Sequence, residues 1–315
     1  MTILYTSPVF LEHDTGAHPE RALRLATISR HLEAEGLLAK CRQPRWKPGT
    51  RAQIGRLHRD TWFDELQAYA EAGGGRIEAD TVVSERSFDA ATLAAGAVCD
   101  AVGRVLKGED QTALCLVRPP GHHAVPKGAM GFCLFNNIAI GAKEAIAAHG
   151  LDRVLIVDWD VHHGNGTQDM FWTDEQVGFL SIHRWPFYPG SGSERETGVG
   201  PGLGYTRNLP VEYGTSRHDY LSYFENELAD FAAKVKPQLV LLSAGFDAHR
   251  QDPIGSLQLE TEDFADLTRI VKQIAAAHCG GKLVSVLEGG YHPDRLAESV
   301  GLHLQGLLES TLPKP

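Results

Sequence analysis

The sequence VLIVDWDVHHGNG at residues 154–166 joins a run of branched apolar residues directly to a cluster of acids and histidines. The predicted strand, Val154 to Asp158, carries apolar side chains on both faces before its final aspartate, which is typical of a strand buried in a parallel sheet. Asp158, Asp160 and His162 follow one another at a spacing of two. If the strand runs on through them, these three side chains point to one side and His163 faces away. We therefore expect one face of this stretch to carry the chemistry.

The same arrangement, a strand followed by polar residues, recurs along the chain. Further strands are predicted at the apolar runs 3–5, 114–117, 177–182, 239–244 and 283–287. The last four are followed by RPPGHHAVPKGAMGF (118–132), HRWPFYPGSG (183–192), GFDAH (245–249) and EGGYH (288–292). In parallel α/β sheets ligands bind at the carboxyl edge of the strands. Five polar clusters at strand ends therefore predict a functional site at that edge.

Segments with helical periodicity separate the predicted strands. They lie at 136–148, 219–235 and 261–278, and in the first part of the chain at 21–35, 61–72 and 90–107. Strands that alternate with helices indicate an α/β fold, in which helices cover both faces of a mainly parallel, multi-stranded sheet. No linker rich in Pro or Ser and no internal repeat divides the chain, so we expect one domain over residues 1–315.

The composition is that of a globular protein, with 43% hydrophobic and 22% charged residues. No apolar run approaches the roughly 18 residues that span a bilayer, and no signal-peptide pattern is visible, so we expect a cytoplasmic location without membrane contact. The five cysteines form no CxxC pair, which disfavours disulfides and a cysteine-type zinc site. A formal net charge of −10 disfavours direct binding to nucleic acids.

Two carboxylates and one imidazole are suited to binding a single divalent cation. Asp160 and His162 supply two ligands, and Asp247 supplies a carboxylate from a neighbouring strand end. With open positions left, this set favours a metal that polarises a carbonyl and acidifies water, zinc first, with Fe(II) or Mn(II) as alternatives. The alternatives are a solvated strand end without metal and, with one carboxylate and two imidazoles, a non-haem iron oxygenase site.

Several segments, in their order along the chain, resemble the zinc-dependent histone deacetylase family. They are RPPGHHA, GFCLFNN, DWDVHHGNGTQ, SIHRWPFYPGSG, SAGFDAH and LEGGY. The resemblance extends from about residue 18 to about Gly290, and the family includes bacterial acetylpolyamine amidohydrolases and acetoin-utilisation proteins. It implies an arginase/deacetylase-like α/β fold and hydrolysis of an N-acyl amine, but it says much less about the substrate.

The resemblance implies a metal-assisted mechanism. Asp160, His162 and Asp247 would be the zinc ligands, and a zinc-bound water would be the nucleophile. His123 would act as the general base toward this water and later protonate the leaving amine, because imidazole titrates near neutral pH. Tyr291 would stabilise the oxyanion together with the zinc.

Three further residues would support this chemistry. The resemblance implies that His122 donates a hydrogen bond to Asp158 and acts mainly through its charge, while Asn165 orients the ring of His123. Class II members of the family tend to have Asn at this position, so the chain resembles class II. The family also implies a bound monovalent cation, expected to be potassium, at Asp158, Asp160, the backbone of His162 and Ser181.

The substrate is expected to enter a narrow aromatic tunnel. By resemblance, Phe132 and Tyr188 would line the stem of the substrate, and Gly131 would place its carbonyl near the substrate amide. Asp80 would be an acid at the rim, and Gly289 would allow a close approach of the backbone to the site. Arg24 would lie beneath the site and help acetate to leave; the alternative for this residue is an arginine on a helix surface.

Several functions remain open at this point. Acyl-lysine in proteins or peptides is favoured over acetylated polyamines, because no long acidic insertion is visible and residues 183–204 carry charges of both signs, namely Arg184, Glu194, Arg195 and Glu196. The acyl group need not be acetyl. An arginase-like ureohydrolase would need two manganese ions and more carboxylates, and a non-catalytic acyl-lysine reader would be expected to have lost site residues. A homo-oligomer is compatible with the sequence.

Overall fold

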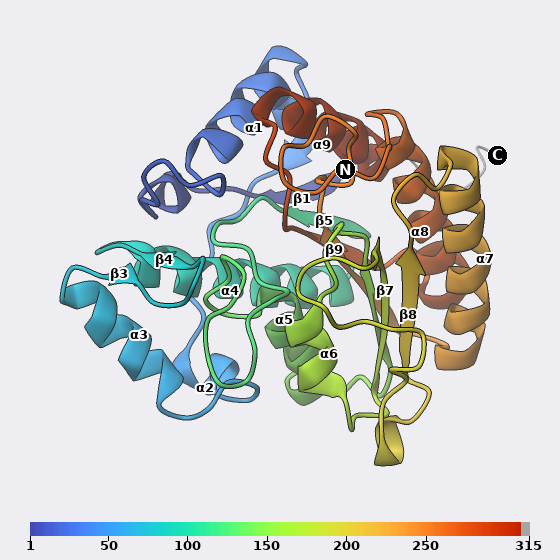
Figure 1. Ribbon diagram of the computed structural model, residues 1–315, viewed down its shortest axis with the longest axis horizontal. Helices are drawn as coiled ribbons and strands as arrows, with labels where there is room; N and C mark the ends of the chain where they lie inside the picture. The colour runs from blue at the N-terminus through green and yellow to red at the C-terminus, as the bar shows by residue number, and fades with distance from the viewer. Residues whose placement is uncertain (310–315) are drawn as a thin grey trace.

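Eight parallel strands form one central sheet in the computed structural model, which describes residues 1–309 (Figure 1). Residues 310–315 of the expected domain lie outside the described part. The strand order is β2-β1-β5-β10-β9-β6-β7-β8, and each neighbouring pair is parallel. The strands are β1 Thr2–Tyr5, β2 Cys41–Arg42, β5 Thr112–Cys115, β6 Val154–Asp158, β7 Val177–Arg184, β8 Thr206–Val211, β9 Leu239–Ala244 and β10 Leu283–Leu287.

Helices cover both faces of this sheet, as the alternation of strands and helices predicts. In Figure 1, α1 and α9 lie above β1 and β5, whereas α4 and α5 lie below these two strands. The helices α7 and α8 pack beside each other on β6, β7, β8 and β9. The bounds of these six helices are α1 Leu23–Ala34, α4 Ser87–Leu106, α5 Asn137–Ala147, α7 Arg217–Val235, α8 Asp263–Cys279 and α9 Pro293–Leu308.

Smaller elements complete the described part of the chain. Three short helices are α2 Arg51–Ile54, α3 Trp62–Glu71 and α6 Asn165–Phe171, and a hairpin pairs β3 Gly75–Arg76 with β4 Val82–Val83. The 3₁₀ helices are η1 Pro8–Leu11, η2 Leu38–Lys40 and η3 Gly200–Gly202. Within residues 1–309, no helix is both long and apolar enough to cross a membrane.

The sheet is buried on both faces, which explains why its strands are continuous apolar runs in the sequence. Every residue of β5, β6, β9 and β10 is buried. The few polar side chains within these strands have partners: Ser285 bonds to the buried His303, and Ser243 donates to Glu288. Pairing of this kind removes the desolvation penalty that an unsatisfied hydroxyl would carry.

The predicted bounds are correct for β6, β9 and β10, whereas β5 lies two residues before its predicted position. β8 was not predicted; it is a strand at the edge of the sheet, and its residues TRNLPV are only partly buried and include Pro210. α9 was not predicted either, and it contains two glycines that weaken helix propensity. One of them allows close packing, because a Cβ at Gly301 would lie 2.7 Å from His31 Nε2 of α1.

The central strand β9 should be a main source of stability. Leu241 is fully buried between β10 and β6, so Leu241→Ala is expected to lower the free energy of unfolding by about 2–5 kcal/mol. Leu203 is 63% exposed, and Leu203→Ala should change this free energy by less than about 0.5 kcal/mol. Urea unfolding of both variants measures the difference, and equal effects would contradict this account of the core.

Candidate active site

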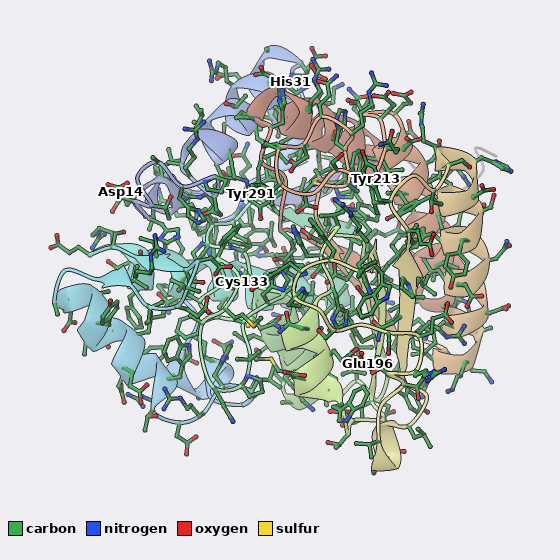
Figure 2. The ribbon with its side chains drawn as sticks, in the orientation of Figure 1. Asp14, His31, Cys133, Glu196, Tyr213 and Tyr291 are labelled. Atoms are coloured by element: carbon green, nitrogen blue, oxygen red, sulfur yellow. The ribbon has the colours of Figure 1, made fainter. Side chains whose placement is uncertain are left out.

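The loops that follow the strands meet at the carboxyl edge of the sheet and enclose a cavity of about 230 Å³. Figure 2 shows Tyr291 near the middle of the molecule, between Asp14 and Tyr213 in this view. The cavity is lined by Asp80, His123, Gly131, Phe132, His162, Phe187, Tyr188, Ile254 and Tyr291. Seven of these nine residues are among those singled out in the sequence. The other two, Phe187 and Ile254, were missed.

The chain turns sharply after β6, so the expected continuation of the strand is wrong. β6 ends at Asp158, whose Oδ1 accepts a hydrogen bond from Asp160 N at 3.0 Å. Asp160 Oδ1 in turn accepts one from His162 N at 2.9 Å. These side-chain hydrogen bonds to the backbone two residues on replace the ladder of a strand. His163 is still separated from Asp160 and His162 by these turns. Its ring nitrogens lie 2.9 Å from Ser191 Oγ and 3.1 Å from Gln168 Oε1.

Asp160, His162 and Asp247 form a buried group whose ligand atoms lie within 4.8 Å of one another. His162 Nδ1 is 3.0 Å from Asp160 Oδ1 and 3.2 Å from Asp247 Oδ2. Apart from this contact with His162, Asp247 Oδ2 is buried and has no hydrogen-bond partner. Burial and the nearby Asp160 carboxylate raise the pKa of Asp247 to about 7. An orphaned carboxylate oxygen beside a second carboxylate fits a site that holds a cation.

Two glycines allow the carboxylates to approach the backbone. Gly289 N donates a hydrogen bond of 2.8 Å to Asp160 Oδ2, and a Cβ at Gly289 would lie 2.1 Å from Asp247 Oδ2. A Cβ at Gly245 would lie 2.1 Å from Asp160 Oδ2. These glycines belong to the motifs GFDAH and EGGYH, so the cluster itself explains why no side chain fits at either position.

The adjacent histidines His122 and His123 have different partners. His122 Nδ1 lies 2.9 Å from Asp158 Oδ2, and His123 Nδ1 lies 2.7 Å from Asn165 Oδ1. Burial lowers the pKa of His122, but Asp158 and Asp160 outweigh it and raise that pKa to about 10. Burial, together with the charges of the neighbouring histidines, lowers the pKa of His123 well below its usual value. One imidazole is therefore held as a cation and the other as a neutral base.

Glu288 holds the loop that carries these histidines, and the sequence analysis did not assign it a role. Its buried carboxylate accepts hydrogen bonds from Gly121 N at 2.7 Å, His122 N at 3.2 Å and Ser243 Oγ at 3.0 Å. Burial raises the pKa of Glu288 to about 7. The only signal in the sequence is its place directly after a buried strand, in LEGGY.

Tyr291 and Arg24 are packed against each other beneath the cavity. Burial, followed by the nearby Asp247, raises the pKa of Tyr291 well above its usual value, so its hydroxyl keeps its proton and can donate it in a hydrogen bond. Arg24 is buried, its guanidinium lies 5.1 Å from the centre of the Tyr291 ring, and its Nε donates to Gly290 O at 2.6 Å. The alternative of a helix-surface arginine is therefore wrong for Arg24.

The walls of the cavity are mainly aromatic. The ring of Tyr188 lies edge-on to His123 at 5.2 Å, and that of Phe187 stacks on His162 at 5.2 Å. Phe132 has a left-handed backbone with φ 70°, a strained conformation that persists only where the surroundings impose it. A Cβ at Gly131 would lie 2.5 Å from the His123 ring, so this position requires glycine.

Two charges at and after the end of β7 hold the loops near the cavity. Arg184, the last residue of β7, lies 4.2 Å above the Phe187 ring and donates to Gly255 O, in the loop after β9, at 2.9 Å. Glu196 accepts from Gly192 N and Ser193 N of its own loop and from the side chain of Gln168. Arg184 therefore joins two loops, whereas Glu196 stabilises its own loop.

Asp158 and Ser181 are register partners on the adjacent strands β6 and β7. Ser181 Oγ lies 2.9 Å from His183 Nδ1. Two of the residues to which the family resemblance assigns a monovalent cation are therefore neighbours on adjacent strands, and the cation stays a prediction.

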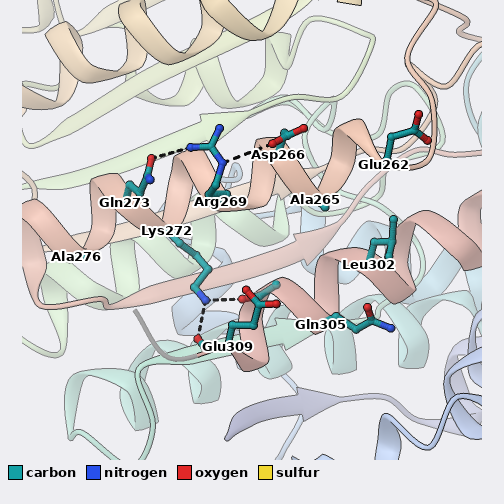
Figure 3. A pocket seen from close by; sticks show the side chains of 11 residues that line it. Glu262, Ala265, Asp266, Arg269, Lys272, Gln273, Ala276, Leu302, Gln305 and Glu309 are labelled. Carbon is teal, nitrogen blue, oxygen red and sulfur yellow. Dashed lines mark hydrogen bonds and ion pairs between the residues drawn. The ribbon is translucent and has the colours of Figure 1, made fainter. Parts of the chain in front are cut away.

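A larger hollow of about 610 Å³ lies away from this edge, between α8 and α9 (Figure 3). Its charged side chains bond to their own surroundings: Arg269 bonds to Asp266 and Gln273, and Lys272 donates to the backbone carbonyls of Gly306 and Glu309. This groove therefore has no set of free converging groups comparable to the cluster at the sheet edge.

Comparisons with known proteins give consistent results. The model of the family described as "Histone deacetylase domain" matches residues 18–307. "Probable deacetylase" from Archaeoglobus fulgidus is 39% identical over 285 residues, which cover 90% of this chain and 79% of that protein. "Polyamine deacetylase HDAC10" from Homo sapiens is 39% identical over 321 residues, which cover 98% of this chain and 47% of the human protein. The solved structure described as "Crystal Structure of HDA15 HD domain" matches with a TM-score of 0.93 and 36% identity, covering 99% of this chain and 90% of that one.

Metal binding to the buried cluster should release protons. Despite burial, the carboxylates of Asp160 and Asp247 raise the pKa of His162 to about 10, and Asp247 itself titrates at about 7. A metal must displace these protons, so zinc affinity is expected to fall by about tenfold per pH unit between pH 9 and 8 and more steeply below pH 7.

Calorimetric zinc titrations at several pH values, in buffers with different ionisation enthalpies, measure the affinity and the protons released. Asp247→Asn should weaken binding and remove the steeper part below pH 7. Asp266→Asn, in the groove between α8 and α9, is the control and should leave both unchanged. An affinity that does not depend on pH would contradict this assignment.

Proposed function

The chain belongs to the histone deacetylase family, and we propose that it removes acetyl or other acyl groups from lysine side chains by metal-dependent hydrolysis. One observation carries this proposal: His162, a member of the buried group Asp160, His162 and Asp247, lines the same aromatic cavity as His123 and Tyr291. This arrangement provides a metal site, a base and a hydrogen-bond donor within one cavity.

Asp160, His162 and Asp247 would hold a divalent metal, zinc first and Fe(II) or Mn(II) as alternatives. When bound, the metal supplies a Lewis acid that polarises the acyl carbonyl and lowers the pKa of water. Asp247 Oδ2 supports this assignment, because a buried carboxylate oxygen that accepts no hydrogen bond is unfavourable, whereas Oδ1 already accepts one from Val161 N. A set of two carboxylates and one imidazole also differs from the two imidazoles of a non-haem iron oxygenase.

His123 is the proposed general base and acid. Its Nδ1 bonds to Asn165 Oδ1, which can only accept, so the proton lies on Nδ1 and Nε2 is free to take a proton from water. The water oxygen adds to the acyl carbon as this proton leaves, and the same proton then passes to the nitrogen of the leaving amine as the carbon–nitrogen bond breaks, which gives a carboxylic acid and a free amine. His122, held as a cation by Asp158, stabilises the negative charge that develops nearby.

Tyr291 is the proposed donor to the acyl oxygen. Because its hydroxyl remains protonated, it can donate a hydrogen bond to the oxygen as negative charge develops there. Arg24, beneath the ring of Tyr291, would attract the carboxylate product and help it to leave. A potassium ion at Asp158, Asp160, the His162 carbonyl and Ser181 would offset the repulsion between the two buried carboxylates.

The walls of the cavity favour acyl-lysine as the substrate. The methylene stem of a lysine is apolar and would lie between Phe132 and Tyr188, with Asp80 placed to accept a hydrogen bond from the peptide backbone. An acetylated polyamine is the second candidate, since one relative is named a polyamine deacetylase. Its distant ammonium groups would need carboxylates at the entrance, whereas the lining includes the apolar Ile254 and one acid, Asp80. A cytoplasmic location and a homo-oligomer stay predictions.

The remaining alternatives have less support. An arginase-like ureohydrolase would need two bridged manganese ions, whereas residues 1–309 contain one group of three potential ligands. A non-catalytic reader of acyl-lysine would bind the substrate without releasing an acid. The measurement of turnover and metal content below separates both from the proposed function.

A panel of acylated amines tests the proposal directly. Purified protein, with its metal content measured in the same sample, should release carboxylate from acyl-lysine peptides of varied chain length and act more slowly on N-acetylputrescine. A faster reaction with N-acetylputrescine would favour the polyamine alternative. No turnover by zinc-loaded protein would favour the reader, and two metals per chain would revive the ureohydrolase.

The hydroxyl of Tyr291 has a defined part in this mechanism. Tyr291→Phe keeps the ring but removes the donor to the oxyanion, and kcat is expected to fall by about 10²–10³-fold. The zinc content should be unchanged, because Tyr291 is not among the proposed ligands. An undiminished kcat would exclude Tyr291 from this role.

Asn165 should influence the pH dependence through His123. Replacing the amide by a carboxylate in Asn165→Asp stabilises the protonated imidazole and raises the pKa of His123. Since the base must be neutral to accept a proton, the acidic limb of the kcat/KM profile is expected to move to higher pH. If the limb of this variant coincides with that of the wild type, Asn165 does not act on His123 in this way.

A further inference from the structure

We propose that Asp252 is a positioning residue that fixes Tyr291 for its role in the proposed hydrolysis. The carboxylate lies in the loop between β9 and α8 and is 6% exposed. Its Oδ2 accepts hydrogen bonds from Tyr291 N at 2.6 Å and His292 N at 3.3 Å. Neither the sequence motifs nor the lining of the cavity had singled out Asp252. It acts through Tyr291, without lining the cavity itself.

The other carboxylate oxygen holds the backbone of its own loop. Asp252 Oδ1 accepts hydrogen bonds from Ile254 N at 2.9 Å and Gly255 N at 3.0 Å. Ile254 and Tyr291 both line the cavity. One carboxylate therefore joins the loop after β9 to the loop after β10, with two N–H groups on each oxygen.

The segment before Tyr291 needs such an anchor. Gly289 and Gly290 precede it directly, and Gly290 has φ 121°, a conformation that only glycine adopts readily. Glycines make the sharp turn possible, but they also leave the following residue free to move. Arg24 holds the carbonyl of Gly290, and Asp252 holds the amides that come after it. Together they fix the peptide from which the Tyr291 side chain extends.

The pattern of acceptors explains why this residue must be an aspartate. Both oxygens of a carboxylate accept, and each here receives two N–H groups. An asparagine of the same shape has one oxygen and one NH2 group. Its NH2 group would face one of the two pairs of N–H groups and could not accept their hydrogen bonds. Asp252→Asn therefore breaks one side of the clamp with almost no change in volume.

A double-mutant cycle with Tyr291→Phe tests the proposal in zinc-loaded, full-length protein. With the best acyl-lysine peptide of the panel, Asp252→Asn is expected to lower kcat by about 10- to 100-fold, the effect of losing a charge-assisted hydrogen bond. In the Tyr291→Phe background, the same change should lower kcat by less than about threefold, because the hydroxyl that it positions is already absent. Multiplicative effects on kcat would overturn the proposal.

Two controls separate positioning from a general loss of structure or metal. Asp263→Asn removes another buried carboxylate, at the start of α8. Asp263 accepts a hydrogen bond from Glu260 N and pairs with Arg217. This variant should leave kcat within about twofold of the wild type. All variants should contain the same amount of zinc. If Asp252→Asn lost zinc, its effect on kcat would arise from the metal ligand Asp247 and not from Tyr291, and the proposal would be overturned.

Hydrogen exchange in the wild-type protein tests the same contact without a variant, in case Asp252→Asn does not fold. The amides of Tyr291 and His292 precede α9, yet they should exchange slowly because a buried carboxylate holds them. Exchange at the rate of an unprotected loop would overturn the proposal. This result is independent of turnover, so an inactive wild type would refute the proposed function and leave the exchange measurement as the test of Asp252.

Discussion

The structure depends on the burial of two carboxylates, Asp160 and Asp247, against one imidazole at the edge of a parallel sheet. Burying like charges together is costly unless a cation and hydrogen bonds offset their repulsion. Several otherwise unrelated features satisfy this condition. Gly245 and Gly289 leave room for the carboxylates, the amide of Gly289 donates to Asp160, and Asp247 Oδ2 accepts no hydrogen bond, as the proposed metal site requires.

The same edge gives identical side chains different properties. His122 and His123 are neighbours in sequence with ring centres 4.0 Å apart, yet one faces the carboxylate of Asp158 and the other the neutral amide of Asn165. The first partner stabilises a positive charge, and the second only orients a ring. A reaction that needs a fixed charge and a neutral base can use both imidazoles, because the fold supplies these two partners from the end of β6 and the start of α6.

Strands that are buried on both faces were predicted more accurately than a strand at the edge of the sheet. The strands β6, β9 and β10 are buried on both faces, so their apolar runs fixed their bounds, whereas the edge strand β8 has mixed residues and was missed. The grouping of Asp160, His162 and Asp247 was predicted because these residues lie in short motifs at strand ends. Residues such as Glu288 and Asp252 were not assigned, because their importance lies in the distant amides that they accept from and not in a local pattern.

The sequence by itself determined the α/β fold, the edge at which the site lies and the grouping of Asp160, His162 and Asp247, because strand burial and strand ends leave local patterns. It also carried the family resemblance that the comparisons confirm. Only the tertiary structure decided that the chain turns after Asp158, that Arg24 is buried beneath Tyr291, and that Asp252 joins two loops. These features depend on hydrogen bonds and packing between residues far apart in the chain, which no local spacing specifies.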